Sequence, residues 1–135
     1  MSLSSTPHRI LIFADDLTGA LDTSGFFSEN NFRTMVVVQP PRKTFRPGDM
    51  VDVVVINTNS RHLMNREAGE RVASCFLNID WKPNVLFKKI DSTLRGNIAE
   101  ETTSLLNVSD CRFAFVCPAF PDQGRTLVDS RLHVD

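Results

Sequence analysis

The sequence predicts an α/β fold, a three-layer sandwich around a mainly parallel, Rossmann-like sheet of about five strands. Short apolar runs alternate along the chain with segments of helical periodicity, which is the pattern of a parallel sheet with crossover helices. Polar clusters follow most of the apolar runs, as expected where parallel strands end at one edge of a sheet. The chain has 135 residues, 41% of them hydrophobic, so it can form one domain with an ordinary core.

Five short apolar runs, several of them rich in β-branched residues, are predicted to be strands. They are residues 9–14, 33–38, 51–56, a strand that begins at 84–87, and 112–117. Residues 39–50 contain three prolines and a glycine and are expected to form a loop. Pro118 ends the fifth strand, because proline has no amide hydrogen to donate to a ladder.

Three helices are expected between these strands. The first covers about residues 18–29, although Gly19 and Gly25 weaken it. The second begins near Asn65, its expected N-cap, and has an apolar stripe formed by Ala68, Val72, Cys75, Phe76 and Ile79. The core face of the third helix consists of Ile98, Thr102, Leu105 and Leu106.

Composition argues against several classes of function. The formal net charge of −1 gives no electrostatic case for a nucleic-acid partner. No apolar run approaches the length of a membrane-spanning helix, so no membrane partner is expected. The three histidines, His8, His62 and His133, form no ligand motif, and no metal site is predicted.

The cysteines and the termini give further expectations. Cys75 and Cys117 lie within apolar runs and are predicted to be buried free thiols. An odd number of cysteines without a secretory signal indicates a reducing cytoplasm. Residues 1–8 are expected to be a flexible segment, and the final residues, which show no capping element, indicate a fragment or a chain ended by a frameshift or early stop. A truncated open sheet would expose an edge, which allows a homo-oligomer.

Four polar segments follow predicted strands, at residues 15–19, 57–61, 88–97 and 118–125. Because the carboxyl ends of parallel strands meet at one edge, we expect these segments to surround one site for a small hydroxylated anion. Aspartates can bind hydroxyl groups and accept a proton from one of them. Arginine, lysine and backbone amides bind carboxylate or phosphate oxygens. The candidate residues are Asp15, Asp16, Asn57, Ser60, Arg61, Lys89, Asp91, Ser92, Arg95, Gln123 and Arg125.

Each of the four polar segments also has a purely structural explanation. Asp16 and Ser92 would cap the first and third helices. Arg95 would pair with a surface acid such as Glu100. The remaining structural explanations are a solvated strand end for Lys88 and Lys89, turn hydrogen bonds for Asn57 and Ser60, and a positive φ for Gly124. A shared location at one edge would favour the functional interpretation over these separate ones.

The motifs resemble those of the four-carbon acid sugar kinase family, formerly a domain of unknown function, of which some members carry the label Hrp-dependent type III effector. Residues 14–20 have the sequence ADDLTGA and, with Asp22 and Thr23, are similar to that family's opening signature. Residues 57–61, 88–97 and 118–126 also resemble family segments, in the same order, and the resemblance spans about residues 9–134. Leu21 stands where the family often has asparagine, a departure from which little consequence is expected.

The resemblance implies an ATP-dependent kinase, with magnesium, that acts on threonate, erythronate or a 3-oxo-tetronate. It also implies an N-terminal domain that holds the acid sugar and a C-terminal domain that binds ATP. Residues 9–135 correspond to part of the first domain, and the sequence contains no counterpart of the nucleotide-binding domain. It also lacks the GxxxxGK[ST] and GxGxxG motifs. This chain alone is therefore expected to bind no ATP.

The resemblance also suggests a role for each candidate. Asp16 and Asp91 are the predicted catalytic carboxylates, with Asp16 on the reacting hydroxyl and Asp15 orienting it. The other predicted roles are substrate binding by Asn57 and Ser60, hydroxyl contacts by Asp91 and Ser92, charge neutralisation by Arg61, Lys89 and Arg95, and closure of the far side by Gln123 and Arg125.

Three alternatives compete with this interpretation. A truncated remnant would bind a ligand without catalysis. A signalling receiver domain needs an aspartate and a lysine where this chain has Asn57 and Pro118. A DxDxT phosphatase needs alternate acids, whereas Asp15 and Asp16 are adjacent.

Overall fold

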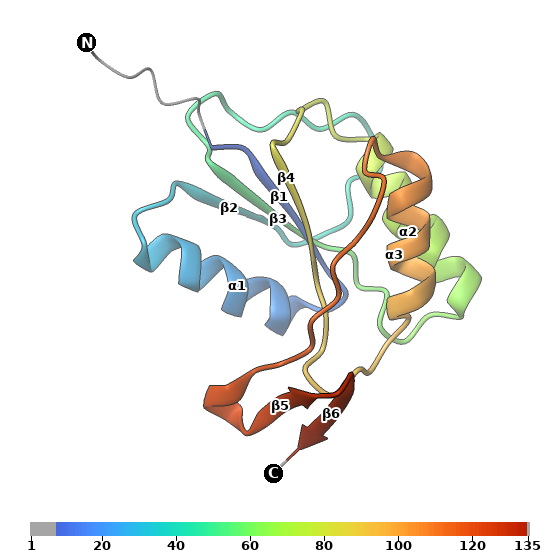
Figure 1. The fold of residues 1–135 in the computed structure, drawn as a ribbon. Coiled ribbons are helices and arrows are strands. Elements are labelled where there is room, and N and C mark those ends of the chain that lie inside the picture. The colour runs from blue at the N-terminus through green and yellow to red at the C-terminus, as the bar shows by residue number, and fades with distance from the viewer. Residues whose placement is uncertain (1–7, 135) are drawn as a thin grey trace.

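The computed structural model describes residues 8–134. A four-stranded parallel sheet, ordered β2-β3-β1-β4, separates one helix on one face from two helices on the other (Figure 1). The strands are β1 (Ile10–Ala14), β2 (Thr34–Val37), β3 (Val53–Asn57) and β4 (Val85–Lys89), and the helices are α1 (Leu17–Glu29), α2 (Asn65–Leu77) and α3 (Ile98–Val108). The predicted α/β sandwich with a parallel sheet is confirmed.

Side chains of the two central strands alternate between the two faces of the sheet. Leu11 and Phe13 of β1 pack in a core beneath α2 and α3, together with Val72 and Leu105. Ile12 and its neighbours on the other face pack against α1. Both strands are therefore almost continuously apolar, as strands covered on both faces must be.

The register of the sheet brings three strands to an end at the same level. Ala14, the last residue of β1, is opposite Asn57 of β3 and opposite Lys89 of β4. The residues that follow these strands therefore emerge together at the carboxyl edge of the sheet, where ligands of open parallel sheets bind. Asp15 is the first residue beyond β1 at this edge.

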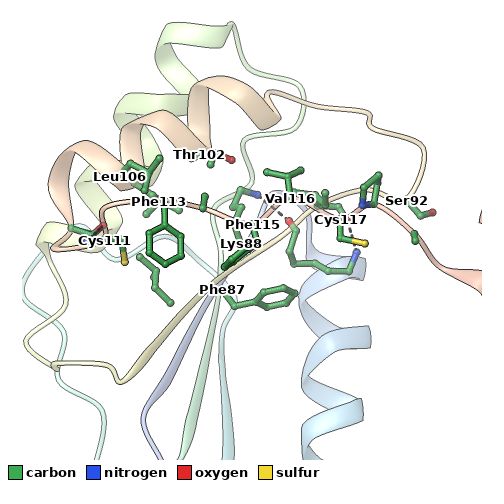
Figure 2. A pocket seen from close by; sticks show the side chains of 18 of the residues that line it. Phe87, Lys88, Ser92, Thr102, Leu106, Cys111, Phe113, Phe115, Val116 and Cys117 are labelled. Carbon is green, nitrogen blue, oxygen red and sulfur yellow. Dashed lines mark hydrogen bonds between the residues drawn. The ribbon is translucent and has the colours of Figure 1, made fainter. Parts of the chain in front are cut away.

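The expected fifth strand, residues 112–117, pairs with no strand of the sheet within the described part of the chain. An apolar cavity of about 690 Å³ lies between this segment and β4 with α3 (Figure 2). Phe113 is 70% exposed and Phe115 is 93% exposed. An apolar pattern indicates that a segment can pack in a sheet but not what covers it, because β-propensity depends on neighbouring side chains. Cys117 is exposed for the same reason, contrary to the prediction, whereas Cys75 is buried.

The end of the described chain forms a hairpin. A short 3₁₀ helix, η1 (Pro121–Gln123), leads into β5 (Arg125–Val128), which pairs antiparallel with β6 (Arg131–Val134). Asp129 and Ser130 both have positive φ, as a tight two-residue hairpin turn requires. Gly124 has the predicted positive φ, at 66°.

Two helix starts differ from expectation. Met64 rather than Asn65 is the N-cap of α2, and Asn97 rather than Ser92 is the N-cap of α3. Because α3 begins at Ile98, six residues after Ser92, Ser92 lies too far from the helix to cap it. The flexible segment predicted for residues 1–8 lies, apart from His8, outside the described residues. None of the helices in residues 8–134 is long and apolar enough to cross a membrane.

Candidate functional site

A groove of about 790 Å³ opens at the carboxyl edge of the sheet. It is bounded by the start of α1, the loops after β3 and β4, and residues 120–125. Eight of the eleven candidate residues line it, namely Asp16, Arg61, Lys89, Asp91, Ser92, Arg95, Gln123 and Arg125. Asp15, Asn57 and Ser60 lie behind its wall and are almost fully buried. Segments far apart in the sequence thus meet at one site, although their chemical roles stay predictions.

Arg61 joins the two adjacent aspartates that follow β1. Its Nε and Nη2 donate to the two carboxylate oxygens of Asp15 at 3.0 and 2.9 Å, and its Nη1 donates to Oδ2 of Asp16 at 2.6 Å. The hydrogen bond to Asp15 is the main cause that raises the pKa of the Arg61 guanidinium. Charge-assisted bidentate pairs are both strong and directional. Arg61 therefore fixes the orientation of both carboxylates.

Asp16 combines its structural role with a position in the groove. It is the N-cap of α1, and its Oδ1 accepts a hydrogen bond from the Gly19 amide at 2.8 Å. A Cβ atom at position 19 would lie 2.8 Å from that same oxygen, so any larger residue there would displace the capping carboxylate. The positive end of the helix dipole favours a carboxylate at this point. The capping explanation is confirmed, and it coexists with partial exposure of the side chain to the groove.

Asp91 organises the loop after β4. It accepts hydrogen bonds from the amide and hydroxyl of Thr93 at 2.9 and 2.6 Å, and from Nε and Nη2 of Arg95 at 3.1 and 2.7 Å. These bonds, first those of Arg95 and then those of Thr93, hold the pKa of the carboxyl well below its usual range. Arg95 thus pairs with Asp91 rather than with Glu100. A carboxylate engaged in this way is a weak proton acceptor.

Gly96 permits the close approach of this loop to the aspartates. Its φ is 92°, and an added Cβ would lie 2.6 Å from Oδ2 of Asp15. Only glycine adopts this backbone conformation easily and leaves room for the carboxylate.

The two lysines that end β4 have separate roles, and neither forms a solvated strand end. Lys89 lines the groove, and its Nζ donates to the Ile90 carbonyl at 2.8 Å. Lys88 points the other way, and its Nζ lies 2.7 Å from Oε2 of Glu101 within the protein. Asn57 makes the expected turn bond, since its Oδ1 accepts from the Asn59 amide at 3.1 Å.

The profile of the sugar-binding N-terminal domain family matches residues 10–135, which is nearly the whole chain. The chain belongs to this family.

Curated relatives of this sugar-binding domain are kinases. The chain is 38% identical to a D-erythronate kinase of Heliobacterium modesticaldum, over 93% of the chain and 29% of that protein. It is 34% identical to a D-threonate kinase of Salmonella typhimurium, over 94% of the chain and 30% of that protein. It is 32% identical to a 3-oxo-tetronate kinase of Pseudomonas savastanoi pv. phaseolicola, over 99% and 32%. The chain spans about a third of the length of these relatives.

A solved structure from Bordetella bronchiseptica has a similar fold. It is described as a domain of unknown function with bound citrate, in a domain-swapped dimer. Its TM-score is 0.80 at 31% identity, over 93% of this chain and 32% of that one.

Sequence reasoning missed two groups of residues in the sugar-binding domain. Four phenylalanines, which carried no motif, form an apolar wall of the groove, namely Phe26, Phe27, Phe87 and Phe120. Glu101 is 1% exposed and was not recognised, although a signal was present. It lies three residues after Ile98 and four before Leu105, so it interrupts the apolar stripe of α3.

The described residues include no group of three or more histidine, cysteine or acidic side chains arranged to hold a metal ion. The carboxylates of Asp15, Asp16 and Asp91 are instead each paired with Arg61, at 2.9, 2.6 and 3.8 Å.

Proposed function

We propose that the groove binds a four-carbon acid sugar, such as threonate, erythronate or a 3-oxo-tetronate, and that the domain is the substrate-binding portion of an ATP-dependent kinase. One observation carries the proposal: eight candidate residues from four separate segments line the same groove. The groove therefore combines a carboxylate that can bind hydroxyl groups with several cationic side chains that can bind an acid group. The names of the relatives and the citrate in the Bordetella structure support a small polar acid as the ligand.

Asp16 is the best candidate to bind the reacting hydroxyl and accept its proton. The oxygens of Asp16 accept hydrogen bonds from Gly19 and Arg61, but its side chain is 28% exposed and lines the groove, whereas Asp15 is 3% exposed and does not. Asp91 is occupied by its own loop, and its low pKa makes it a weak base. In the proposed division of roles, Asp16 faces the ligand, Asp15 orients Arg61, and Asp91 holds Arg95 at the edge of the groove.

The cations of the groove would bind the carboxylate of the acid sugar and later the transferred phosphoryl group. Lys89 and Arg95 lie on the sheet side and Arg125 on the far side. Nε of Arg125 is buried without a hydrogen-bond partner in the described part of the chain. A buried donor without a partner costs about 1–3 kcal/mol, so a bound anion that accepts from it would gain affinity.

The phosphate donor would be held by a C-terminal nucleotide-binding domain outside this sequence, and residues 9–135 would form the sugar-acid-binding unit. When bound, ATP with magnesium supplies the phosphoryl group. The residues described here offer no three-ligand set for magnesium, so no step of the proposal runs through that ion. The chain's own contribution is to bind the acid, orient its hydroxyl and accept the proton at Asp16.

Binding without phosphoryl transfer is the second candidate function. It is favoured by the match to a sugar-binding family together with coverage of about a third of the relatives. Incubation of the full-length gene product, rather than of this domain alone, with ATP, magnesium and each acid separates the two functions, since only the kinase forms ADP.

The primary experiment is calorimetric titration of the chain with D-erythronate and D-threonate. We expect binding of at least one acid, and we expect Asp16→Asn to weaken it at least about tenfold, since hydrogen bonds to charged groups contribute about 1.5–3 kcal/mol. Asparagine caps helices as well as aspartate, so the variant should stay folded. The control is Asp49→Asn, at an exposed loop position that precedes β3 and so lies at the opposite edge. Absence of heat with every acid, for a folded chain, would refute the proposal.

We also propose that the protein forms a homo-oligomer and works in a reducing cytoplasm. The exposed Phe113 and Phe115 beside the edge strand β4 support self-association, as does the domain-swapped dimer of the Bordetella relative. Free thiols at Cys75, Cys111 and Cys117 support a reducing compartment. Light scattering over a tenfold range of concentration tests the first proposal.

A further inference from the structure

A charged pair is buried between β4 and α3, and neither of its members lines the groove. Glu101 is 1% exposed, the side chain of Lys88 is 9% exposed, and Nζ lies 2.7 Å from Oε2. Burying two ions costs several kcal/mol each, and apolar replacements of such pairs are often neutral or stabilising. The pair is therefore poorly explained as a simple source of stability.

The second oxygen of Glu101 connects the pair to the loop that carries Arg61. Oε1 accepts a hydrogen bond from the hydroxyl of Ser60 at 2.6 Å, and Ser60 is the residue before Arg61. Ser60 is completely buried and does not line the groove. Because a carboxylate only accepts hydrogen bonds, the single hydroxyl proton of Ser60 is donated to Glu101.

The connection continues to the strand that carries the aspartates. Since the Ser60 proton goes to Glu101, the hydroxyl of Thr58 donates to Oγ of Ser60 at 2.7 Å. The amide of Thr58 donates to the carbonyl of Ala14 at 2.8 Å. The amides of Ser60 and Arg61 donate to the carbonyl of Asp15 at 2.9 and 3.2 Å. A continuous hydrogen-bonded chain thus runs from α3 to both segments that meet at Arg61.

We propose that Glu101, held by Lys88, is a positioning residue: through Ser60 it fixes the loop after β3, so that Arg61 keeps the carboxylates of Asp15 and Asp16 in their orientation. The consequence for ligand affinity rests on the proposed function, whereas the effect on Arg61 does not. Buried polar contacts of this kind favour one local arrangement, because displacement of Ser60 would leave Oε1 of Glu101 without its hydrogen-bond donor.

The competing explanation is that the pair only ties β4 to α3. The two explanations differ for two variants. Ser60→Ala keeps the ion pair and removes the link to the loop. Lys88→Met combined with Glu101→Leu replaces the pair by apolar side chains, which preserves packing between β4 and α3 and also removes the link. The control is Ser24→Ala, at a buried serine whose hydroxyl donates to the Leu21 carbonyl at 2.8 Å, away from the groove.

The experiment combines thermal unfolding, calorimetry with D-erythronate and D-threonate, and the NMR signal of the Arg61 Nε–Hε group. That signal reports directly on the bond from Arg61 Nε to Asp15 Oδ2. We expect both test variants to shift or broaden it and to raise the Kd at least about tenfold, since misplacing a site by 1 Å can cost as much as a hundredfold. The Ser24→Ala variant should keep the wild-type signal and Kd.

The stability measurement separates positioning from simple structural support. We expect the Lys88→Met and Glu101→Leu double variant to unfold at or above the wild-type temperature while the Arg61 signal still moves. An Arg61 signal that stays at its wild-type position in either folded test variant overturns the inference. If the wild-type chain binds no acid, the proposed function fails, and the Arg61 signal alone still decides the positioning role.

Discussion

The two rims of the groove are built in different ways. On the sheet side, Arg61 bonds to Asp15 and Asp16 across 46 and 45 residues of sequence, and Asn97 bonds to the Ser60 carbonyl across 37. On the far side, residues 120–125 bond mainly within their own turn, as from the Phe120 amide to the Arg125 carbonyl at 2.8 Å. One rim is fixed by tertiary contacts, and the other by local structure.

This difference indicates how the groove would work. A rim that is held by long-range hydrogen bonds to the core can open only if much of the fold unfolds with it. A rim that makes mainly local contacts has a low free energy of opening. The sheet side would therefore hold its geometry before a ligand arrives, and residues 120–125 would adjust to the ligand afterwards. Matched substitutions on the two rims test this contrast.

The largest effect is expected for Arg61→Ala on the sheet side. The change leaves the carboxylate of Asp15, which is 3% exposed, without its partner. Removal of one member of a buried pair costs about 3–5 kcal/mol. Urea unfolding should show this loss, and calorimetry should show no ligand binding.

The control for this change is Arg66→Ala, which breaks an exposed pair with Glu70 on α2. Exposed pairs at this spacing contribute about 0.3–0.5 kcal/mol. Similar losses in the two variants would mean that the bonds around Arg61 do not hold the sheet-side rim.

A smaller effect is expected for Gly96→Ala, compared with the same change at Gly124 on the far rim. Both glycines have positive φ, at 92° and 66°. Alanine at either position would be held at a positive φ, a strain that costs about 1–3 kcal/mol. At position 96 the added methyl group would also displace the carboxylate of Asp15. Thermal unfolding and calorimetry should therefore show a larger loss of stability and of binding for Gly96→Ala. Equal losses would contradict the contrast between the rims.

Acid should remove part of the stability of the sheet-side rim. Asp91 has a folded-state pKa well below its unfolded value of about 3.9, mainly because of Arg95. Its contribution is fully present above the unfolded pKa and is lost as the pH falls through the folded pKa. Urea unfolding should therefore show a deficit for Asp91→Asn at pH 7 that shrinks below about pH 4.

Asp52 provides the control, since its hydrogen bond with Arg33 lowers its pKa to about 2 at a site away from the groove. Asp52→Asn should show the same trend in acid without a change in ligand affinity. A deficit for Asp91→Asn that grows as the pH falls would contradict the assignment.

Much of the fold was predictable because the signals are local. The apolar runs of β1 and β3 indicated central strands, and the position of Asp16 at a strand end indicated both a helix cap and a site residue. Open parallel sheets bind ligands at the carboxyl ends of their strands, and this rule was sufficient to predict that the distant polar segments meet at one edge.

The wrong and missed predictions have a common physical cause: a local sequence pattern does not reveal which distant residue a side chain contacts. Residues 112–117 have the pattern of a strand but pair with none in the described chain. Glu101 was missed because its partners, Lys88 and Ser60, are 13 and 41 residues away. The aromatic wall was missed because its four members come from three separate segments.

The smallest effect on stability is expected for Arg125→Ala on the far rim. Nε of Arg125 has no partner in the described part of the chain, and its Nη1 donates only to the neighbouring Gln123 carbonyl, so removal of the side chain breaks no long-range bond. The free energy of unfolding should fall by no more than about 0.5 kcal/mol. Calorimetry should still show weaker binding of the acid, by about tenfold for one lost charge-assisted hydrogen bond.

Arg131→Ala is the matched control for this last change, because Arg131 lies on the same hairpin but does not line the groove. It should leave both stability and affinity at their wild-type values. If Arg125→Ala destabilises the chain as strongly as Arg61→Ala does, the far rim is part of the rigid fold, and the groove has one kind of wall instead of two. If it changes neither quantity, residues 120–125 do not contact the ligand, and binding depends on the sheet-side rim alone.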